Sequence, residues 1–194
     1  MLTASRRMHY SYREYLALEA ESPIRHEYLD GEIYAMAGGT PDHAALSLTV
    51  LSLVRAQLPH GCRAFTSDLR VRIPATGLTT YPDGAVVCGG TQRADDDAIA
   101  VVNPVLLIEV TSNSSEDYDR GEKLRHYQAI PTVREVLIVS HRKPHLTLHR
   151  RGEDGRWIGI EAGAGETLAL TATGGSLPVD DVYRDGLEDV PVEH

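Results

Sequence analysis

Apolar positions along the chain follow the period of helices in some segments and that of strands in others. Helical spacing predicts helices over residues 11–19, 41–58 and 114–129. Alternating or continuous apolar runs predict a hairpin over 25–37, strands over 62–66, 68–73, 81–88, 105–111 and 133–139, a second hairpin over 145–161 and a candidate last strand over 168–170. This order predicts an α/β fold with a mixed central β-sheet flanked by helices.

Capping and turn residues mark several boundaries of these elements. Ser11 is followed three residues later by Glu14, which is the capping box of a helix start. The pair Asp30-Gly31 is typical of a tight hairpin turn. The three aspartates of residues 95–97 indicate an acidic loop before the strand over 105–111.

Length and charge limit the kinds of protein that this chain can be. At 194 residues we predict a single domain over 1–194, with a core over 9–160 and an acidic C-terminal extension over 161–194. The formal net charge of −9 counts against a generic nucleic-acid-binding protein, because such proteins usually present a basic face. Part of the negative charge lies in the extension and the acidic loop. Several arginines remain that could form a basic rim: Arg63, Arg70, Arg72, Arg120 and Arg125.

Neither a membrane segment nor a secretory signal is visible in the sequence. The apolar runs are too short to cross a bilayer, and residues 1–8 lack the apolar stretch of a signal peptide. We therefore expect a cytoplasmic protein with no membrane partner. Cys62 and Cys88 match no metal-ligand spacing, and we expect reduced, partly buried thiols.

Two acidic residues stand at the ends of two predicted strands. Asp83 lies between Pro82 and Gly84, a triplet that is also common in turns, so a turn aspartate is the ordinary alternative. Glu109 is the only charged residue of the apolar run over 104–110. A buried carboxylate needs a partner, which a metal, a lysine or an arginine would provide. Two carboxylates on adjacent strands can hold a hard divalent cation.

The predicted helix that follows carries one lysine within its apolar spacing. Asp119, Lys123 and Tyr127 are four residues apart and therefore share one helix face. If that face packs toward Glu109, the Lys123 ammonium can orient a water or stabilise developing negative charge. A solvated helix lysine is the alternative interpretation.

These residues resemble the core of the PD-(D/E)xK nuclease superfamily. The lysine of that pattern usually lies two residues after the second acid, a position that Thr111 occupies here. A longer stretch is similar to the Uma family of restriction-endonuclease domains and spans roughly residues 9–160. The resemblance implies a restriction-endonuclease-like fold in which the lysine has moved to the following helix, at Lys123. It is carried by the segments 26–39, 65–71, 81–83, 109–112 and 119–127, together with His43.

Three further polar residues are candidates for supporting roles. In the resemblance to the Uma family, Glu27 corresponds to the family's N-terminal glutamate and could hold a metal-bound water. His43 could meet a phosphate or the metal, or be an ordinary helix-start histidine, and Asp68 could hold an arginine or a metal-bound water. The histidines at 141, 145 and 149 recur every four residues, but their surroundings alternate as in a strand, which makes zinc the weaker interpretation.

We therefore predict an endonuclease that hydrolyses DNA phosphodiester bonds with Mg²⁺ or Mn²⁺ and without a covalent intermediate. Asp83 and Glu109 are the predicted metal ligands, with the Val110 carbonyl as a candidate third ligand, and Lys123 is the predicted catalytic cation. The alternative is a non-catalytic module that binds nucleic acid or a protein, which Thr111 and the acidic charge favour. A structural dimer subunit or antitoxin-like regulator is a further alternative without a motif of its own.

Two observations would separate or extend these interpretations. The enzyme requires that the Lys123 amine reach the site of Asp83 and Glu109, whereas a binding module does not. We also expect a homodimer, because two-fold pairing would place two sites against the two strands of a duplex.

Overall fold

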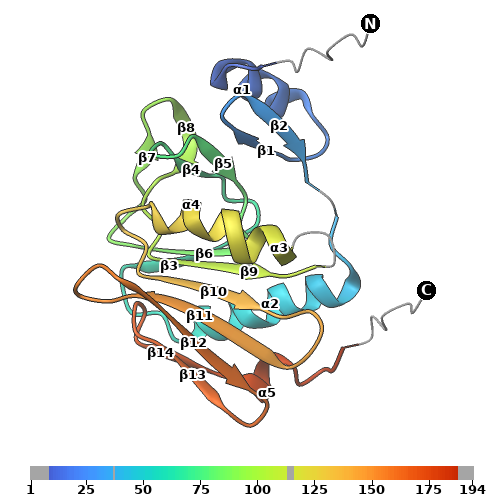
Figure 1. The fold of residues 1–194 in the computed structure, drawn as a ribbon, viewed down its shortest axis with the longest axis vertical. Coiled ribbons are helices and arrows are strands. Elements are labelled where there is room, and N and C mark those ends of the chain that lie inside the picture. Colours follow the sequence, from blue (N-terminus) through green and yellow to red (C-terminus); the bar gives the residue numbers. More distant parts are fainter. Residues whose placement is uncertain (1–8, 37, 113–115, 188–194) are drawn as a thin grey trace, which may run out of the picture.

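Two six-stranded mixed sheets enclose a helical layer (Figure 1). The computed structural model describes residues 9–36, 38–112 and 116–187. The helices are α1 (Tyr12–Glu21), α2 (Pro41–Ala56), α3 (Glu116–Tyr118), the π-helix η1 (Asp119–Lys123), α4 (Leu124–Gln128) and α5 (Val179–Val182). The strands are β1 (His26–Leu29), β2 (Glu32–Ala35), β3 (Cys62–Thr66), β4 (Val71–Ile73), β5 (Leu78–Thr80), β6 (Gly84–Cys88), β7 (Arg93–Ala94), β8 (Asp97–Val101), β9 (Leu106–Val110), β10 (Glu135–Val139), β11 (His145–Arg151), β12 (Trp157–Gly163), β13 (Thr167–Leu170) and β14 (Gly175–Pro178).

Each large sheet contains one parallel pair among antiparallel neighbours. Sheet A has the order β2-β1-β5-β4-β8-β7, and sheet B has the order β12-β11-β10-β9-β6-β3. The parallel pairs are β4 with β8 and β9 with β10. The predicted α/β class with mixed sheets and flanking helices is confirmed, but the strands are divided between two sheets where we had placed one.

The central strands of sheet B are buried on both faces, each face against a different hydrophobic cluster. On one face, α2 presents Leu46, Val50 and Val54 at helical spacing to strand residues such as Ile108. On the other face, α4 lies between sheets A and B, and its Leu124 packs with apolar residues of both (Figure 1). Since successive strand residues point to opposite faces, neighbours along β9 reach different clusters.

The predicted N-terminal boundaries agree with the structure. Ser11 and Glu14 form the capping box of α1, each accepting from the backbone N–H of the other. Asp30 and Gly31 connect β1 to β2 with φ of 43° and 92°, the left-handed conformation that a two-residue hairpin turn requires. The last residue of the predicted hairpin, Ala37, lies outside the described residues.

The prediction of an acidic loop after β6 was wrong. Residues 93–94 and 97–101 form β7 and β8 of sheet A. Asp97 begins β8 as a buried carboxylate paired with Arg70, and Ala100 and Val101 are buried with it. The strand was missed because it begins in an acidic run. The arginine that pairs with Asp97 lies 27 residues earlier, which the local pattern does not show.

The expectation of reduced thiols was also wrong. Cys62 and Cys88 form a disulfide between β3 and β6. The antiparallel register places the two residues directly opposite each other, with Cα atoms 4.0 Å apart. Their separation of 26 residues in the sequence gave no sign of this pairing.

Residues 167–182 belong to the packed structure although we had placed them in an acidic extension. β13 and β14 form an antiparallel hairpin that precedes α5. Leu168, Leu170, Leu177, Val179 and Val182 from this region are buried in the cluster on the α2 side of sheet B. The acidic residues of this extension at positions 188, 189 and 193 lie outside the described residues.

The helices of the described residues are short. The longest, α2, has 16 residues, and none is both long and apolar enough to cross a membrane.

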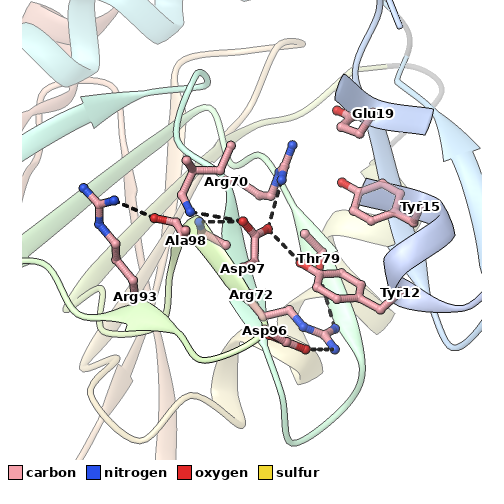
Figure 2. Close-up of polar contacts among 12 residues, drawn as sticks. Tyr12, Tyr15, Glu19, Arg70, Arg72, Thr79, Arg93, Asp96, Asp97 and Ala98 are labelled. Carbon is pink, nitrogen blue, oxygen red and sulfur yellow. Dashed lines mark hydrogen bonds and ion pairs between the residues drawn. The ribbon is translucent and has the colours of Figure 1, made fainter. Parts of the chain in front are cut away.

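A largely buried polar network, which we call the Arg70–Asp97 cluster, ties α1 to sheet A (Figure 2). Its members are Tyr12, Glu19, Arg70, Arg72, Tyr81, Asp96 and Asp97. The Asp97 carboxylate accepts from Arg70 and from the Tyr12 hydroxyl, each at 2.9 Å. Arg72 stacks on the Tyr12 ring, 3.9 Å from its centroid, and pairs with Asp96 at 3.3 Å. The hydroxyl of Tyr81 accepts from Arg70 and donates to Glu19, which fixes the chain two residues before Asp83.

Candidate active site

Asp83 and Glu109 lie side by side at one end of sheet B. Gly84 pairs with Ile108 in the antiparallel ladder. Asp83 precedes Gly84 and Glu109 follows Ile108, so the two acids occupy neighbouring positions. The Val110 N–H donates to Asp83 Oδ2 at 2.8 Å, which joins the two chain segments directly. Asp83 itself precedes β6, because the strand begins at Gly84 and not at residue 81 as predicted.

Glu109 is buried on the face of sheet B that α4 covers. It lies two residues after Leu107, whose side chain packs in the cluster with α4, so the two side chains share a face. The Glu109 side chain is 4% exposed and accepts a hydrogen bond from the Tyr127 hydroxyl. Its second partner is Lys123 Nζ at 3.0 Å.

The helix that carries Lys123 contains a wider turn that ends at this lysine. α3, η1 and α4 are continuous from Glu116 to Gln128, and η1 is a π-helix. Such wide turns are rare and occur often at functional sites. The predicted helix is confirmed apart from this turn and from residues 114–115, which lie outside the described residues. Asp119, Lys123 and Tyr127 are all buried, so the shared polar face predicted from their spacing faces the protein interior.

The Lys123 ammonium lies among three carboxylates. Besides Glu109, it contacts Glu27 Oε1 at 3.2 Å and Asp119 Oδ1 at 3.7 Å. Glu27 is in turn fixed by the hydroxyl of Thr80, which donates to the same oxygen. Three segments of the chain therefore converge on one cation: β1, β9 and the helical layer, with Thr80 of β5 supporting Glu27. We call this group of Glu27, Asp83, Glu109, Asp119 and Lys123 the Lys123 cluster.

Negative charge exceeds positive charge in the Lys123 cluster. Burial raises the pKa of Glu109 to about 8, and the nearby charges of Asp83 and Asp119 act in the same direction against the opposing effect of Lys123. Burial alone would lower the pKa of Lys123, but the surrounding carboxylates, Glu109 first, outweigh it and raise that pKa well above its ordinary value. The lysine thus stays protonated, and its ammonium is shared by three carboxyl groups, while Asp83 beside them pairs with His43.

The donor set fits a hard divalent cation that keeps several waters. Within the described residues, no group of three or more His, Cys, Asp or Glu side chains is arranged to hold a metal ion. Mg²⁺ commonly uses one or two carboxylates and completes its shell with water or substrate oxygens. The contacts of Asp83 in the described structure go to Oδ2 and those of Glu109 to Oε1, which leaves Oδ1 and Oε2 for a cation. The surplus of buried negative charge favours a cation at the same place.

His43 contacts Asp83 from the opposite face of sheet B. Thr40 caps α2 by accepting from the His43 N–H, which sets the ring at the first turn of the helix. His43 Nε2 lies 3.2 Å from Asp83 Oδ2, and the hydrogen bond to Asp83 raises the pKa of the imidazole. His43 also interacts with the Val110 carbonyl, the predicted third metal ligand.

The remaining predicted residues divide between the site and elsewhere. Glu27 and Tyr127 join the Lys123 cluster, whereas Asp68 is exposed and pairs with Arg25, one of the alternatives left open from the sequence. Two residues near the site were missed. Thr80 holds Glu27, and His141 Nδ1 lies 2.8 Å from the Thr111 hydroxyl beside the end of β9. Only the pairing of β9 with β10 brings His141 there, so no local sequence signal could have found it.

A mixed α/β fold with an acidic strand end facing a buried helix lysine is that of a restriction-endonuclease-like protein. The chain matches the Uma2 family, described as "Putative restriction endonuclease", over residues 12–180. It belongs to this family, as the resemblance in the sequence predicted.

Two proteins are similar to this chain in sequence and one solved structure is similar in fold. An uncharacterized protein of Synechocystis sp. is 37% identical over 175 residues, which cover 90% of this chain and 91% of that protein. A second uncharacterized protein of that organism is 28% identical over 146 residues, covering 75% of this chain and 82% of the other. The crystal structure of "a putative nuclease belonging to DUF820" from Anabaena variabilis matches with a TM-score of 0.73 at 17% identity, covering 89% of this chain and 96% of that one. At that identity the match shows the fold.

Proposed function

We propose that this protein is a divalent-metal-dependent endonuclease that hydrolyses DNA phosphodiester bonds. The observation that carries the proposal is the 3.0 Å contact between Lys123 Nζ and Glu109. It brings the helix lysine to the carboxylate pair, although the position two residues after Glu109 is Thr111. A module that only binds nucleic acid or protein has no need for a buried ammonium at this place.

Asp83 and Glu109 are the residues that would hold Mg²⁺ or Mn²⁺, each through its remaining carboxylate oxygen. A cation bound there supplies a Lewis acid for the scissile phosphate and lowers the pKa of a water. Its positive charge would also offset the surplus of carboxylates in the Lys123 cluster.

The side chains around the pair each have a definite task in this proposal. Lys123 orients the attacking water or stabilises the negative charge that develops on the phosphate, and it is positioned by Asp119 and Glu27. Tyr127 holds one oxygen of Glu109, and His43 holds one oxygen of Asp83, so both carboxylates are oriented before substrate arrives. Because water attacks directly, the reaction forms no covalent intermediate with the protein.

Pairing of two chains is part of the proposal. A two-fold dimer would present two sites to the two strands of a duplex. Light scattering at micromolar concentration should give the mass of two chains, and a monomer mass would remove this part of the proposal without affecting the chemistry.

The test is cleavage of supercoiled, linear and single-stranded DNA by the full chain in Mg²⁺ or Mn²⁺. Wild type and Asp95→Asn, which removes an exposed carboxylate on the β7–β8 turn, should cleave at equal rates. Glu109→Gln, purified in the same way, should be inactive, which also controls for a contaminating nuclease. If wild type cleaves none of the three substrates with either metal, the non-catalytic binding module takes the place of this proposal.

A further inference from the structure

A basic patch borders the active-site end of sheet B, and the mechanism proposed above does not use it. It consists of Arg120 on η1 and of Arg142 and Lys143 in the turn between β10 and β11. Glu116 accepts from Arg120 Nε at 3.2 Å and from Arg142 Nε at 2.8 Å. Two arginines from distant parts of the chain are thus held by one carboxylate, and Lys143 adds a third, exposed cation. In a chain of net charge −9, two arginines that share one acid, with the exposed Lys143 next to Arg142, form a local group of positive charge.

The strand register fixes the distance from this patch to the candidate site. Glu109 pairs with Ile138, and Ile138 pairs with Thr147 on the next strand. Arg120 Nη1 lies 3.4 Å from the Thr147 hydroxyl. Neighbouring strands are separated by about 4.8 Å, so the patch lies about 10 Å from Glu109 across the sheet. Arg120 is also three residues before Lys123 in the same helical segment.

The turn that carries Arg142 and Lys143 is held at both ends. Ser140 N–H donates to the His145 carbonyl at 3.1 Å, which closes the turn. The buried Tyr183 hydroxyl contacts the carbonyls of Ser140 and His145 at 2.7 and 3.0 Å. The cations therefore project from a fixed platform, and ordering them on binding costs little conformational entropy.

From this geometry we propose that the Arg120–Arg142–Lys143 patch binds the phosphodiester backbone of the nucleic-acid substrate beside the scissile bond. The inference rests on the proposed function for the identity of its partner. A patch about 10 Å from Glu109 is close enough to meet a backbone phosphate within a few nucleotides of the cleaved bond. Guanidinium groups suit this task because they bind phosphate oxygens in a bidentate manner. The patch also supplies the local positive charge that the overall composition lacks.

Binding can be measured without cleavage on the metal-free full chain in EDTA. The probes are fluorescein-labelled 30-mers of one sequence, as duplex DNA, single-stranded DNA and RNA, and the readout is fluorescence anisotropy across a salt series. The test variant is Arg142→Glu/Lys143→Glu. The matched control is Arg134→Glu/Arg156→Glu, which makes the same change of net charge at exposed positions at the opposite end of the same strands.

We expect the test variant to raise the dissociation constant at least tenfold for the probe that is the substrate. The slope of log affinity against log salt should fall by about 2, since each lost phosphate contact removes about 0.9. The control variant should bind as wild type does. Equal weakening in both variants, or an absence of wild-type binding to all three probes, would overturn the inference.

The two proposals fail separately. If wild type binds through the patch but cleaves nothing in Mg²⁺ or Mn²⁺, the enzyme proposal falls and the binding surface stands. If wild type cleaves and the Arg142→Glu/Lys143→Glu variant has the same KM and salt dependence, the binding surface falls and the enzyme proposal stands.

Discussion

Two buried polar clusters, built from similar residue types, hold their carboxylates in opposite electrostatic states. In the Arg70–Asp97 cluster, burial acts to raise the pKa of Asp97, but hydrogen bonds from Arg70, the Ile99 N–H and Tyr12 outweigh it, and the pKa is lowered. In the Lys123 cluster, burial dominates and raises the pKa of Glu109 to about 8. Both carboxylates are nearly inaccessible, at 5% and 4% exposure, so burial alone does not separate them.

The difference arises from the balance of charge and donors. Arg70 and Arg72 face Asp96, Asp97 and Glu19, and tyrosine hydroxyls complete the hydrogen bonding (Figure 2). In the Lys123 cluster a single ammonium is shared by three carboxyl groups, and the fourth, Asp83, pairs with His43. The Arg70–Asp97 cluster, which has more cations and donors for each carboxylate, is complete as folded and serves structure. In the Lys123 cluster, the proposed metal ion and phosphate would supply the missing interactions.

The largest expected effect is the loss of cleavage in Glu109→Gln. Removing one of two metal ligands should lower the rate by on the order of 10³-fold or more, because Lewis-acid stabilisation amounts to several kcal/mol. The metal-free variant should melt no lower than wild type at neutral pH, since Glu109, with its pKa raised to about 8, is already largely uncharged there and glutamine is a neutral side chain of similar shape. Initial rates and calorimetric melting curves measure the two quantities. A variant that stays active, or that unfolds far earlier, would make Glu109 a structural residue like Asp97.

Asp97→Ala should show the reverse pattern. Breaking a buried ion pair leaves Arg70 without its partner and destabilises the fold by about 3–5 kcal/mol. Urea denaturation of wild type and variant measures this loss. Cleavage per folded molecule should stay near the wild-type rate, because the side-chain partners of Asp97 are Arg70 and Tyr12, which lie outside the Lys123 cluster. A large rate loss in fully folded variant would show that the two clusters are not separate.

Lys123→Met should lower the cleavage rate by about 100- to 1,000-fold, the usual effect of removing one preorganised charge that stabilises a transition state. The burial of Lys123 adds a second effect: the metal-free variant should also lose stability, because three carboxylates lose their shared cation. Saturating Mn²⁺ should restore much of that stability without restoring the rate. Wild-type cleavage by the variant would move the catalytic role to another residue, with His43 or Arg125 next.

The smallest expected effect is in the pH dependence of stability. Asp97 has a lowered pKa in the folded protein, so its contribution is fully present above the unfolded pKa of about 3.9 and is lost as pH falls through the folded value. The stability gap between wild type and Asp97→Asn should therefore be constant from pH 5 to 7 and narrow below about pH 4. Urea denaturation at pH 7 and pH 3 measures the gap. A gap that stays constant down to pH 3 would mean that the pair with Arg70 contributes nothing.

The sequence pattern was sufficient for the parts of the fold that local spacing determines. The capping box at Ser11, the Asp30-Gly31 turn and the shared face of Asp119, Lys123 and Tyr127 all depend on residues at most eight positions apart. The choice of Glu109 followed from one charge in an apolar run, which is also local.

What the pattern missed depends on partners far away in the chain. β8 looked like an acidic loop because the partner of Asp97 is Arg70, which lies just before β4 and far away in the sequence. The disulfide follows from the register of β3 and β6, and the place of His141 follows from that of β9 and β10. The division into two sheets is likewise a matter of long-range pairing, which apolar periodicity does not encode.

Under the proposed function, Glu109 belongs to a cluster that binds a divalent metal ion. The most direct measurement is a calorimetric titration of the metal-free protein with Mn²⁺ at neutral pH, without nucleic acid. Wild type and Asp95→Asn should bind Mn²⁺ with equal affinity, and Glu109→Gln should lose this binding. Equal binding by Glu109→Gln and wild type, or no binding by wild type, would contradict it.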